Sequence, residues 1–224
     1  MVVGPRAVHA GDKHERHHAI LNAAERLLLH SPDRIANMAE VAQEAGLAKG
    51  TVYLYFPSKE ELLLALHERN IDSFFQALIA LLDGDAGVTI EDVFALTRTH
   101  IVESPLFLPL ASRCFGVMDQ SVPAAAARAF KQRMAERLEL AGAGLERHFA
   151  ALTPDDAVSL LRHSYALILG LWQMAGSDSG SPDTRADQPA SPVFAWRYSD
   201  ELERAIFALW EGTLAGAARR GPKR

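Results

Sequence analysis

The sequence contains a single cysteine, Cys114, so it cannot form a disulfide within one chain. It also lacks any uninterrupted apolar run that approaches the ~18 residues of a membrane-spanning helix. Its first 13 residues have no apolar stretch like the core of a signal peptide. These absences predict a protein of the reducing cytoplasm that has no membrane partner.

The sequence also has little of the alternation between apolar and polar residues that marks half-buried strands. Instead, apolar residues recur at helical spacing between capping and breaking signals. With 224 residues and a hydrophobic fraction of 49%, the chain can bury a sizeable core in one large domain or two small ones. We therefore predict an all-α fold of about nine helices.

The charge of the chain is unevenly distributed along the sequence. The net charge is −5, yet residues 1–60 carry seven basic and seven acidic residues and are neutral overall. The other residues carry 16 Lys and Arg residues against 21 Asp and Glu residues, and five of the nine histidines lie among the first 30 residues. A neutral, His-rich N-terminal segment on an acidic body permits DNA binding by that segment.

Four helices are expected in the N-terminal part of the chain. Apolar residues at i, i+3, i+4 spacing predict the first helix over residues 14–30. Asn37 begins a capping box that opens a short second helix, and Gly46 ends this helix as a left-handed cap. A third short helix is expected over residues 49–55, and a long fourth helix over residues 58–82.

Five further helices are expected in the C-terminal part. Capping residues and prolines predict that they begin near residues 89, 105, 123, 154 and 199. The segment before the last helix, residues 176–192, is rich in Ser, Asp, Gly and Pro and predicts a mobile loop.

Residues 38–56 have the pattern of two helices joined by a glycine turn. Ala42 is small enough to let two helices cross closely, and Val52 supplies an apolar contact from the third helix. A helix of about two turns is marginal in isolation, so the first two helices must hold it in place. A helix-turn-helix presents its recognition helix to the major groove of DNA in this way.

Two segments of the chain resemble the TetR family of transcriptional regulators. Residues 20–28 (ILNAAERLL) resemble the first helix of that family, and residues 41–62 (VAQEAGLAKGTVYLYFPSKEEL) resemble its signature. The resemblance covers about residues 14–65. The sequence departs from the pattern at Ala48, where the family often has a Ser or Thr that caps the recognition helix, a loss of ~1 kcal/mol.

The resemblance implies two domains. A helix-turn-helix DNA-binding domain would occupy residues 1–60, with residues 1–13 as a flexible arm. A helical ligand-binding and dimerisation domain would occupy residues 61–224. The implied function is that of a repressor released from a pseudo-palindromic operator by a small, largely apolar effector. The alternatives are a regulator that a ligand activates for DNA binding, and a helical small-molecule-binding protein or enzyme without DNA function.

The resemblance also places the DNA contacts. They fall at Lys49, Gly50, Thr51, Tyr53, Leu54, Tyr55 and Lys59. Lys49 can donate to guanine or phosphate, and Thr51 can offer its hydroxyl and methyl groups to a base edge. Lys59 stands at the start of the fourth helix, where free N–H groups favour a phosphate. Leu54 could read a thymine methyl group or could simply be exposed.

The middle helices are rich in Phe, Leu, Met and Ala and could enclose an apolar cavity for a ligand. The candidate apolar lining residues are Phe74, Phe94, Ile101, Phe115, Met118, Phe130, Met134 and Leu167. The candidate polar anchors are Arg98, Arg113 and His163. Core packing or surface exposure is the competing explanation for each of these residues.

The last two helices are the dimer interface that the resemblance implies. One apolar stripe consists of Leu160, Leu161, Ser164, Ile168 and Leu171. The other consists of Leu202, Ala205, Ile206, Leu209, Trp210 and Thr213. Two such helices from each subunit would form a four-helix bundle with two-fold symmetry.

An enzyme is the main interpretation from another class of protein. The sequence has no nucleophile elbow, no phosphate-binding loop and no zinc-ligand spacing, so we expect no catalysis, metal or cofactor. His14 and His17 lack the HExxH spacing and are expected to be solvated. Cys114 is interpreted as a buried apolar group, with a redox sensor as the alternative. Gly142 and Gly144 are expected to mark close helix packing or a kink.

Overall fold

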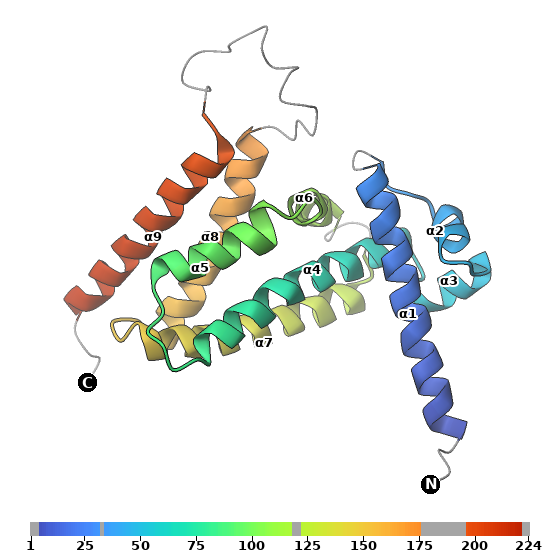
Figure 1. Ribbon diagram of the computed structural model, residues 1–224, viewed down its shortest axis with the longest axis horizontal. Coiled ribbons are helices and arrows are strands. Elements are labelled where there is room, and N and C mark those ends of the chain that lie inside the picture. The colour runs from blue at the N-terminus through green and yellow to red at the C-terminus, as the bar shows by residue number, and fades with distance from the viewer. Residues whose placement is uncertain (1–4, 32–33, 118–121, 176–195, 221–224) are drawn as a thin grey trace, which may run out of the picture.

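The computed structural model describes residues 5–31, 34–117, 122–175 and 196–220, and Figure 1 shows the arrangement of their helices. In these segments the chain is all-α and contains no strand, which confirms the predicted fold class. No helix in the same segments is both long enough and apolar enough to cross a bilayer. The predicted loop over residues 176–192 lies outside the described residues.

The N-terminal unit consists of α1 (Pro5–His30), α2 (Met38–Glu44) and α3 (Lys49–Tyr55). Helix α1 begins at Pro5 rather than near residue 14, and proline is favoured in the first helical turn. The sequence prediction relied on the apolar stripe that starts at Ile20. The N-terminal end of α1 extends beyond the other helices (Figure 1).

The turn between α2 and α3 forms as predicted. Asn37 Oδ1 accepts hydrogen bonds from the backbone N–H groups of Ala39 and Glu40, at 2.9 and 3.1 Å, and the Glu40 carboxylate accepts one from Asn37 N. Gly46 has a φ of +67°, which is the left-handed region that glycine adopts without strain. Leu47 N then donates to Ala42 O at 2.9 Å, which closes the helix end.

Helix α4 (Lys59–Leu82) is the long connection between the two ends of the molecule. Ser58 Oγ accepts from Glu61 N at 3.1 Å and caps the start of this helix. The helix predicted over residues 89–103 is divided into α5 (Ile90–Thr97) and the π-helical segment η1 (Arg98–Val102). A local change of hydrogen-bond register of this kind leaves the apolar pattern nearly unaltered, so the pattern cannot reveal it.

The remaining helices are α6 (Phe107–Val117), α7 (Ala124–His148), α8 (Pro154–Ala175) and α9 (Tyr198–Arg220). Figure 1 shows α7 alongside α4, and α8 alongside α9. Gly144 marks the crossing of α7 and α4, because a Cβ atom there would lie 2.9 Å from Leu82 Cβ. A Cβ atom at Gly142 would lie 2.8 Å from Val158 Cγ2 on α8. Both glycines therefore allow close helix packing, as expected.

The buried apolar residues form two cores. The first core joins α1, α2 and α3 to Leu62, Leu63 and Leu66 of α4 and to Leu106, Leu110 and Cys114 at α6. The second core contains the rest of α4, most of α5 to α9, and Phe107, Leu108 and Ala111 of α6. Helices α4 and α6 thus contribute to both cores, and the first core extends past residue 60.

Ion pairs hold α4 between its neighbours. Arg69 of α4 donates to Asn22 Oδ1 at 2.6 Å and to Glu25 Oε2 at 2.5 Å, both on α1. On the opposite side, Arg137 of α7 donates to Asp72 Oδ1 at 2.6 Å and to Glu68 Oε1 at 3.1 Å. Position and tilt of α4 are therefore coupled to both the N-terminal unit and α7.

Candidate DNA-binding surface and internal cavity

Helix α3 is held in place by packing rather than by its own caps. It has seven residues, and its N-cap residue Ala48 makes no side-chain hydrogen bond. Val52 and Phe56 are buried in the first core, at 0% and 4% exposure. Because so short a helix is unstable alone, these two side chains fix its position and direct its other face outward.

The outer face of α3 is formed by exposed residues at i, i+3 and i+4 spacing. Lys49, Gly50, Tyr53 and Leu54 are all exposed, and the exposed fraction of Leu54 is 84%. The Lys49 Nζ atom lies 5.8 Å from the centroid of the Tyr53 ring, within cation–π range. This face offers a cation, an aromatic hydroxyl and an apolar side chain to a partner.

The other residues that the resemblance placed at DNA lie beside this face. Thr51, Tyr55 and Lys59 are half-buried, and Tyr55 packs against the first core. At the C-terminal end of α3, the His17 ring lies 4.9 Å from the Phe56 ring. Burial lowers the pKa of His17, and the neighbouring His18, His14 and Arg69 lower it further.

The two glutamates of α2, the helix before α3, are paired with arginines. Glu44 pairs with Arg26 at 2.6 Å, and Glu40 pairs with Arg34 at 2.8 Å. Within the described segments, Lys49 forms no ion pair. A lysine that is not neutralised beside an exposed recognition surface can attract a phosphate.

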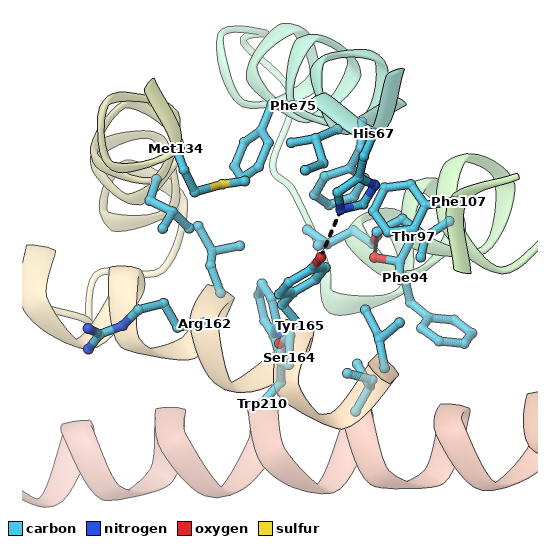
Figure 2. Close-up of a pocket in the computed structure, with 18 of the residues that line it drawn as sticks. His67, Phe75, Phe94, Thr97, Phe107, Met134, Arg162, Ser164, Tyr165 and Trp210 are labelled. Atoms are coloured by element: carbon cyan, nitrogen blue, oxygen red, sulfur yellow. Dashed lines mark hydrogen bonds between the residues drawn. The ribbon is translucent and has the colours of Figure 1, made fainter. Parts of the chain in front are cut away.

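A cavity of about 290 Å³ lies within the second core, surrounded by α4 to α9 (Figure 2). Its described lining consists of His67, Ile71, Phe74, Phe75, Ile90, Val93, Phe94, Thr97, Ile101, Phe107, Cys114, Phe130, Met134, Leu138, Leu161, Arg162, Ser164, Tyr165, Ile168, Ile206 and Trp210. The walls are mostly aromatic and aliphatic, as is usual for sites that bind small molecules.

The cavity includes part of the lining set that the sequence suggested. Phe74, Phe94, Ile101, Phe130 and Met134 line it. The side chains of Phe115 and Met118 lie outside the described residues.

The suggested polar anchors lie elsewhere, which corrects that part of the prediction. Arg98 is exposed and lies 3.7 Å from Glu103, and His163 is exposed on α8. Arg113 is half-buried on α6 away from the cavity lining, and Leu167 packs against the second core without lining the cavity. Arg98 stays at the surface, because the cavity offers no partner that would offset the desolvation of its guanidinium group.

The stripes of α8 and α9 that were predicted to form the dimer interface lie partly inside their own chain. Leu161, Ser164, Ile168, Ile206 and Trp210 line the cavity. Leu160 and Leu202 are buried in the second core, whereas Leu171, Ala205, Leu209 and Thr213 are half-buried. The buried members of both stripes cover the core of their own chain, and the half-buried members remain a prediction for the dimer interface.

Besides Arg162 and the Cys114 thiol, the polar groups of the cavity wall are a histidine, two hydroxyl residues, a tyrosine and an indole. His67 Nε2 lies 3.2 Å from Tyr165 Oη, and the burial of the imidazole lowers the pKa of His67 to about 4. Thr97 Oγ1 donates to Val93 O at 2.9 Å, and Trp210 Nε1 donates to Ser164 Oγ at 3.0 Å. His67 is not among the residues that the sequence suggested, although its position among the apolar residues of α4 could have indicated it.

The cavity reaches the surface between α7 and α8. A groove of about 260 Å³ there shares Phe130, Met134, Leu138 and Arg162 with the cavity. Arg162 is exposed, and Figure 2 shows its side chain directed away from the other labelled residues. On another wall, Cys114 is buried, and this burial raises the pKa of its thiol to about 12. A thiol with so high a pKa is a poor redox sensor.

Two family models match the chain. The model described as "Tetracyclin repressor-like, C-terminal domain" matches residues 68–217, and the model "Bacterial regulatory proteins, tetR family" matches residues 20–66. The two matches divide the chain within α4, close to where the two cores meet.

Similar curated proteins match over the N-terminal part. The HTH-type transcriptional regulator EthR of Mycobacterium tuberculosis is 36% identical over 80 residues, which is 36% of this chain and 37% of that protein. The fatty acid metabolism regulator protein of Bacillus subtilis is 29% identical over 66 residues, 30% of this chain and 34% of that protein. The chain thus spans about a third of the length of these relatives.

Solved structures share the whole fold. A TetR-family transcriptional regulator from Mesorhizobium loti has a TM-score of 0.54 and 21% identity, and the match covers 90% of this chain and 96% of that one. A TetR-family regulator from Streptomyces coelicolor has a TM-score of 0.51 and 18% identity, with 88% and 99% coverage. The fold, together with the family model that spans most of the chain, shows that the protein belongs to the TetR family of bacterial regulatory proteins.

Proposed function

We propose that the protein is a ligand-responsive transcriptional regulator that binds operator DNA through α3 and carries no catalytic activity. The observation that supports this most directly is the outer face of α3, where Lys49, Tyr53 and Leu54 are exposed while Val52 and Phe56 anchor the helix. A major groove admits an α-helix, and this face supplies groups for both phosphate and base edges. Its place of action is the cytoplasm, where the operator lies.

The cavity in the second core is proposed as the effector site. It touches the first core directly, because Cys114 belongs to that core and also lines the cavity. His67 and Phe107, on the two helices that both cores share, line the cavity as well. A ligand that requires a different spacing of α4 and α6 would therefore displace the N-terminal unit.

The effect of the ligand is proposed to be release from DNA. Two recognition helices can enter successive major grooves only at one separation, so a tilt of α4 in each subunit reduces operator affinity. The ligand must bind the released state more tightly than the DNA-bound state, since equal affinities shift nothing. The opposite preference would make the protein a regulator that its ligand activates.

We propose a two-fold dimer through the outward faces of α8 and α9. A Cβ atom at Gly170 or Gly212 would have no neighbour within 4 Å, and Met174 is 70% exposed. Small residues on these faces would let a second copy approach closely. A symmetric dimer implies a pseudo-palindromic operator. Sedimentation should give a mass near twice 24.5 kDa, and a monomer that still binds its operator tightly would contradict the interface.

The test of DNA binding is fluorescence anisotropy with labelled DNA from upstream of the protein's own gene. The variant Lys49→Ala should weaken binding by about tenfold if the lysine contacts a base directly. The matched control is Lys131→Ala, an exposed lysine on α7 that lies at the groove rather than near α3. Wild-type affinity of Lys49→Ala, or equal losses in the two variants, would contradict the proposed surface.

A further inference from the structure

His67 is a polar side chain buried in the wall of an apolar cavity. It is 2% exposed, and its Nε2 atom is engaged with Tyr165 Oη at 3.2 Å (Figure 2). Its second nitrogen, Nδ1, is buried and has no hydrogen-bond partner. Buried polar atoms without partners are rare and costly in folded proteins, so this atom invites a partner from outside the chain.

The other polar side chains with described contacts in the cavity are already engaged. Thr97 Oγ1 donates to Val93 O, and Ser164 Oγ donates to Leu160 O while it accepts from Trp210 Nε1. Among the described lining residues, His67 Nδ1 is the buried side-chain nitrogen or oxygen atom without a hydrogen-bond partner, and a ligand that reaches it would satisfy it. A water molecule is a poor alternative, because a stable buried water needs two to four polar partners, roughly three on average.

The size of the cavity fits a ligand of two rings. A cavity of ~150 Å³ lined by apolar side chains can hold one benzene molecule. This cavity measures about 290 Å³, and Phe74, Phe94, Phe107 and Trp210 provide aromatic walls. Aromatic walls favour ring-containing ligands through stacked and edge-to-face contacts.

The chemistry around His67 favours an uncharged ligand group. Burial lowers the pKa of His67 to about 4, so the imidazole is neutral at pH 7 and cannot balance a carboxylate. Among the described lining residues, Arg162 is the side chain that carries a charge at pH 7, and it lies exposed at the opening. An ionised group next to His67 would lose its hydration without gaining a counterion.

A neutral imidazole can either donate or accept at Nδ1, depending on its tautomer. When the Tyr165 hydroxyl donates to Nε2, Nδ1 carries the proton and donates to a carbonyl oxygen. When Nε2 donates to the tyrosine oxygen instead, Nδ1 accepts from a hydroxyl group. Both arrangements satisfy the histidine completely.

We propose that the effector is an uncharged molecule of about two rings, apolar except for a carbonyl or hydroxyl oxygen that hydrogen-bonds to His67 Nδ1. This inference rests on the proposed role of the cavity as the effector site. It assigns His67 as the residue that selects an oxygen-bearing ligand over a hydrocarbon of the same shape.

The test compares two probes with the same carbon skeleton, cyclohexyl phenyl ketone and benzylcyclohexane. Their affinities for the full-length protein at pH 7.5 are measured by displacement of the neutral fluorophore N-phenyl-1-naphthylamine. The ketone should bind roughly tenfold more tightly than the hydrocarbon, after correction for their partition from water, since it satisfies Nδ1. The charged probe 4-cyclohexylbenzoate should bind more weakly than the ketone.

Variants then show which residue causes the preference for the ketone over the hydrocarbon. His67→Phe should bring the two affinities together, whereas the control Thr97→Val, at another buried polar residue of the wall, should keep their ratio. The wild-type ratio itself tests the proposal even if the histidine variant folds poorly. Equal affinities in the wild-type protein, or a ratio that His67→Phe leaves unchanged, overturn the assignment while the cavity remains a binding site. Failure of the fluorophore and both probes to bind overturns the assignment together with the proposed effector cavity.

Discussion

At the scale of single residues, neighbouring side chains of α3 have different roles: some hold the helix in the fold, and others are free to contact DNA. Val52 is completely buried, and Leu54, two positions later, is 84% exposed. On a helix, positions two apart point to different sides, so one side chain holds the helix and the other meets solvent or DNA. An exposed leucine is unremarkable by itself, and its place on the recognition face is what suggests contact with a thymine methyl group.

Replacing each of these residues by alanine should separate the two roles. Val52→Ala should lower the free energy of unfolding by about 2 kcal/mol, because it leaves a cavity in the first core. Leu54→Ala should change stability by less than about 0.5 kcal/mol and should weaken operator binding at an A·T step. Urea unfolding and anisotropy with labelled operator measure the two effects. Normal operator affinity of Leu54→Ala would mean that the leucine is merely exposed.

His67 should make the stability of the protein depend on pH. Its pKa is about 4 in the folded chain and 6.5 ordinarily, so the unfolded chain binds more protons between these values. The free energy of unfolding therefore falls as the pH falls through this window, by about 2 kcal/mol between pH 7.5 and pH 5. Burial raises the pKa of Tyr165, its hydrogen-bonded neighbour, which stays neutral throughout.

The measurement is the urea-unfolding free energy at pH 7.5 and pH 5 for the wild type and for His67→Phe. The variant lacks the titrating group, so its loss of stability at pH 5 should be smaller by about 2 kcal/mol. Identical losses in the two proteins would show that His67 does not titrate as its burial requires.

At the scale of helices, local sequence signals predict most helix boundaries correctly, but they do not predict which helices pack against each other. The Asn37 capping box and the positive φ of Gly46 follow from side chains only a few residues apart, and both form as predicted. The stripes that contain Ile168 and Ile206 are also present, and part of each stripe lines the cavity of its own chain. An apolar stripe shows that a helix is covered and does not show what covers it.

The same limit applies to the cavity. Phe74 and Phe94 were suggested from composition and do line it, whereas Arg98 and His163 were suggested as anchors and lie at the surface. The cavity depends on the relative positions of six helices. A single sequence does not give these positions, so it cannot tell which polar residues line the cavity and which lie at the surface. The position of His67 on the apolar face of α4 indicates burial, but its contact with Tyr165 depends on how α4 and α8 pack.

Replacing two glycines on different helices by alanine should change the free energy of unfolding in opposite directions. Gly144→Ala places a Cβ atom 2.9 Å from Leu82 Cβ, so α7 must move away from α4. The expected loss is about 1–3 kcal/mol of unfolding free energy. Gly50→Ala meets no atom within 4 Å. It should stabilise α3 by up to about 1 kcal/mol through better helix propensity, and the added methyl group should weaken operator binding.

Urea unfolding of both glycine variants tests the packing, and anisotropy with Gly50→Ala tests the DNA surface. A destabilised Gly50→Ala protein would mean that the backbone of α3 is not helical there. Unchanged operator affinity would mean that DNA does not approach the backbone at residue 50.

At the scale of the whole molecule, two helices carry information between the cavity and the N-terminal unit. Leu63 and Leu66 of α4 belong to the first core, and His67 lines the cavity. In α6, Leu110 belongs to the first core and Phe107 lines the cavity. Packed cores respond to displacement by shifting between discrete arrangements rather than by deforming gradually, so a ligand that moves these helices changes the position of α3.

This coupling predicts a reciprocal effect between effector and operator. Couplings between sites are typically ~1–3 kcal/mol, so a bound effector should lower operator affinity by roughly 5- to 150-fold. Thermodynamic linkage then requires operator DNA to lower effector affinity by the same factor. The measurement titrates a compound found by thermal-shift screening into the free dimer and into the dimer–operator complex. Equal affinities in the two titrations would defeat the release mechanism for that compound. Tighter binding to the complex would instead identify a regulator that its ligand activates, because the ligand would then favour the arrangement of α4 that fits DNA.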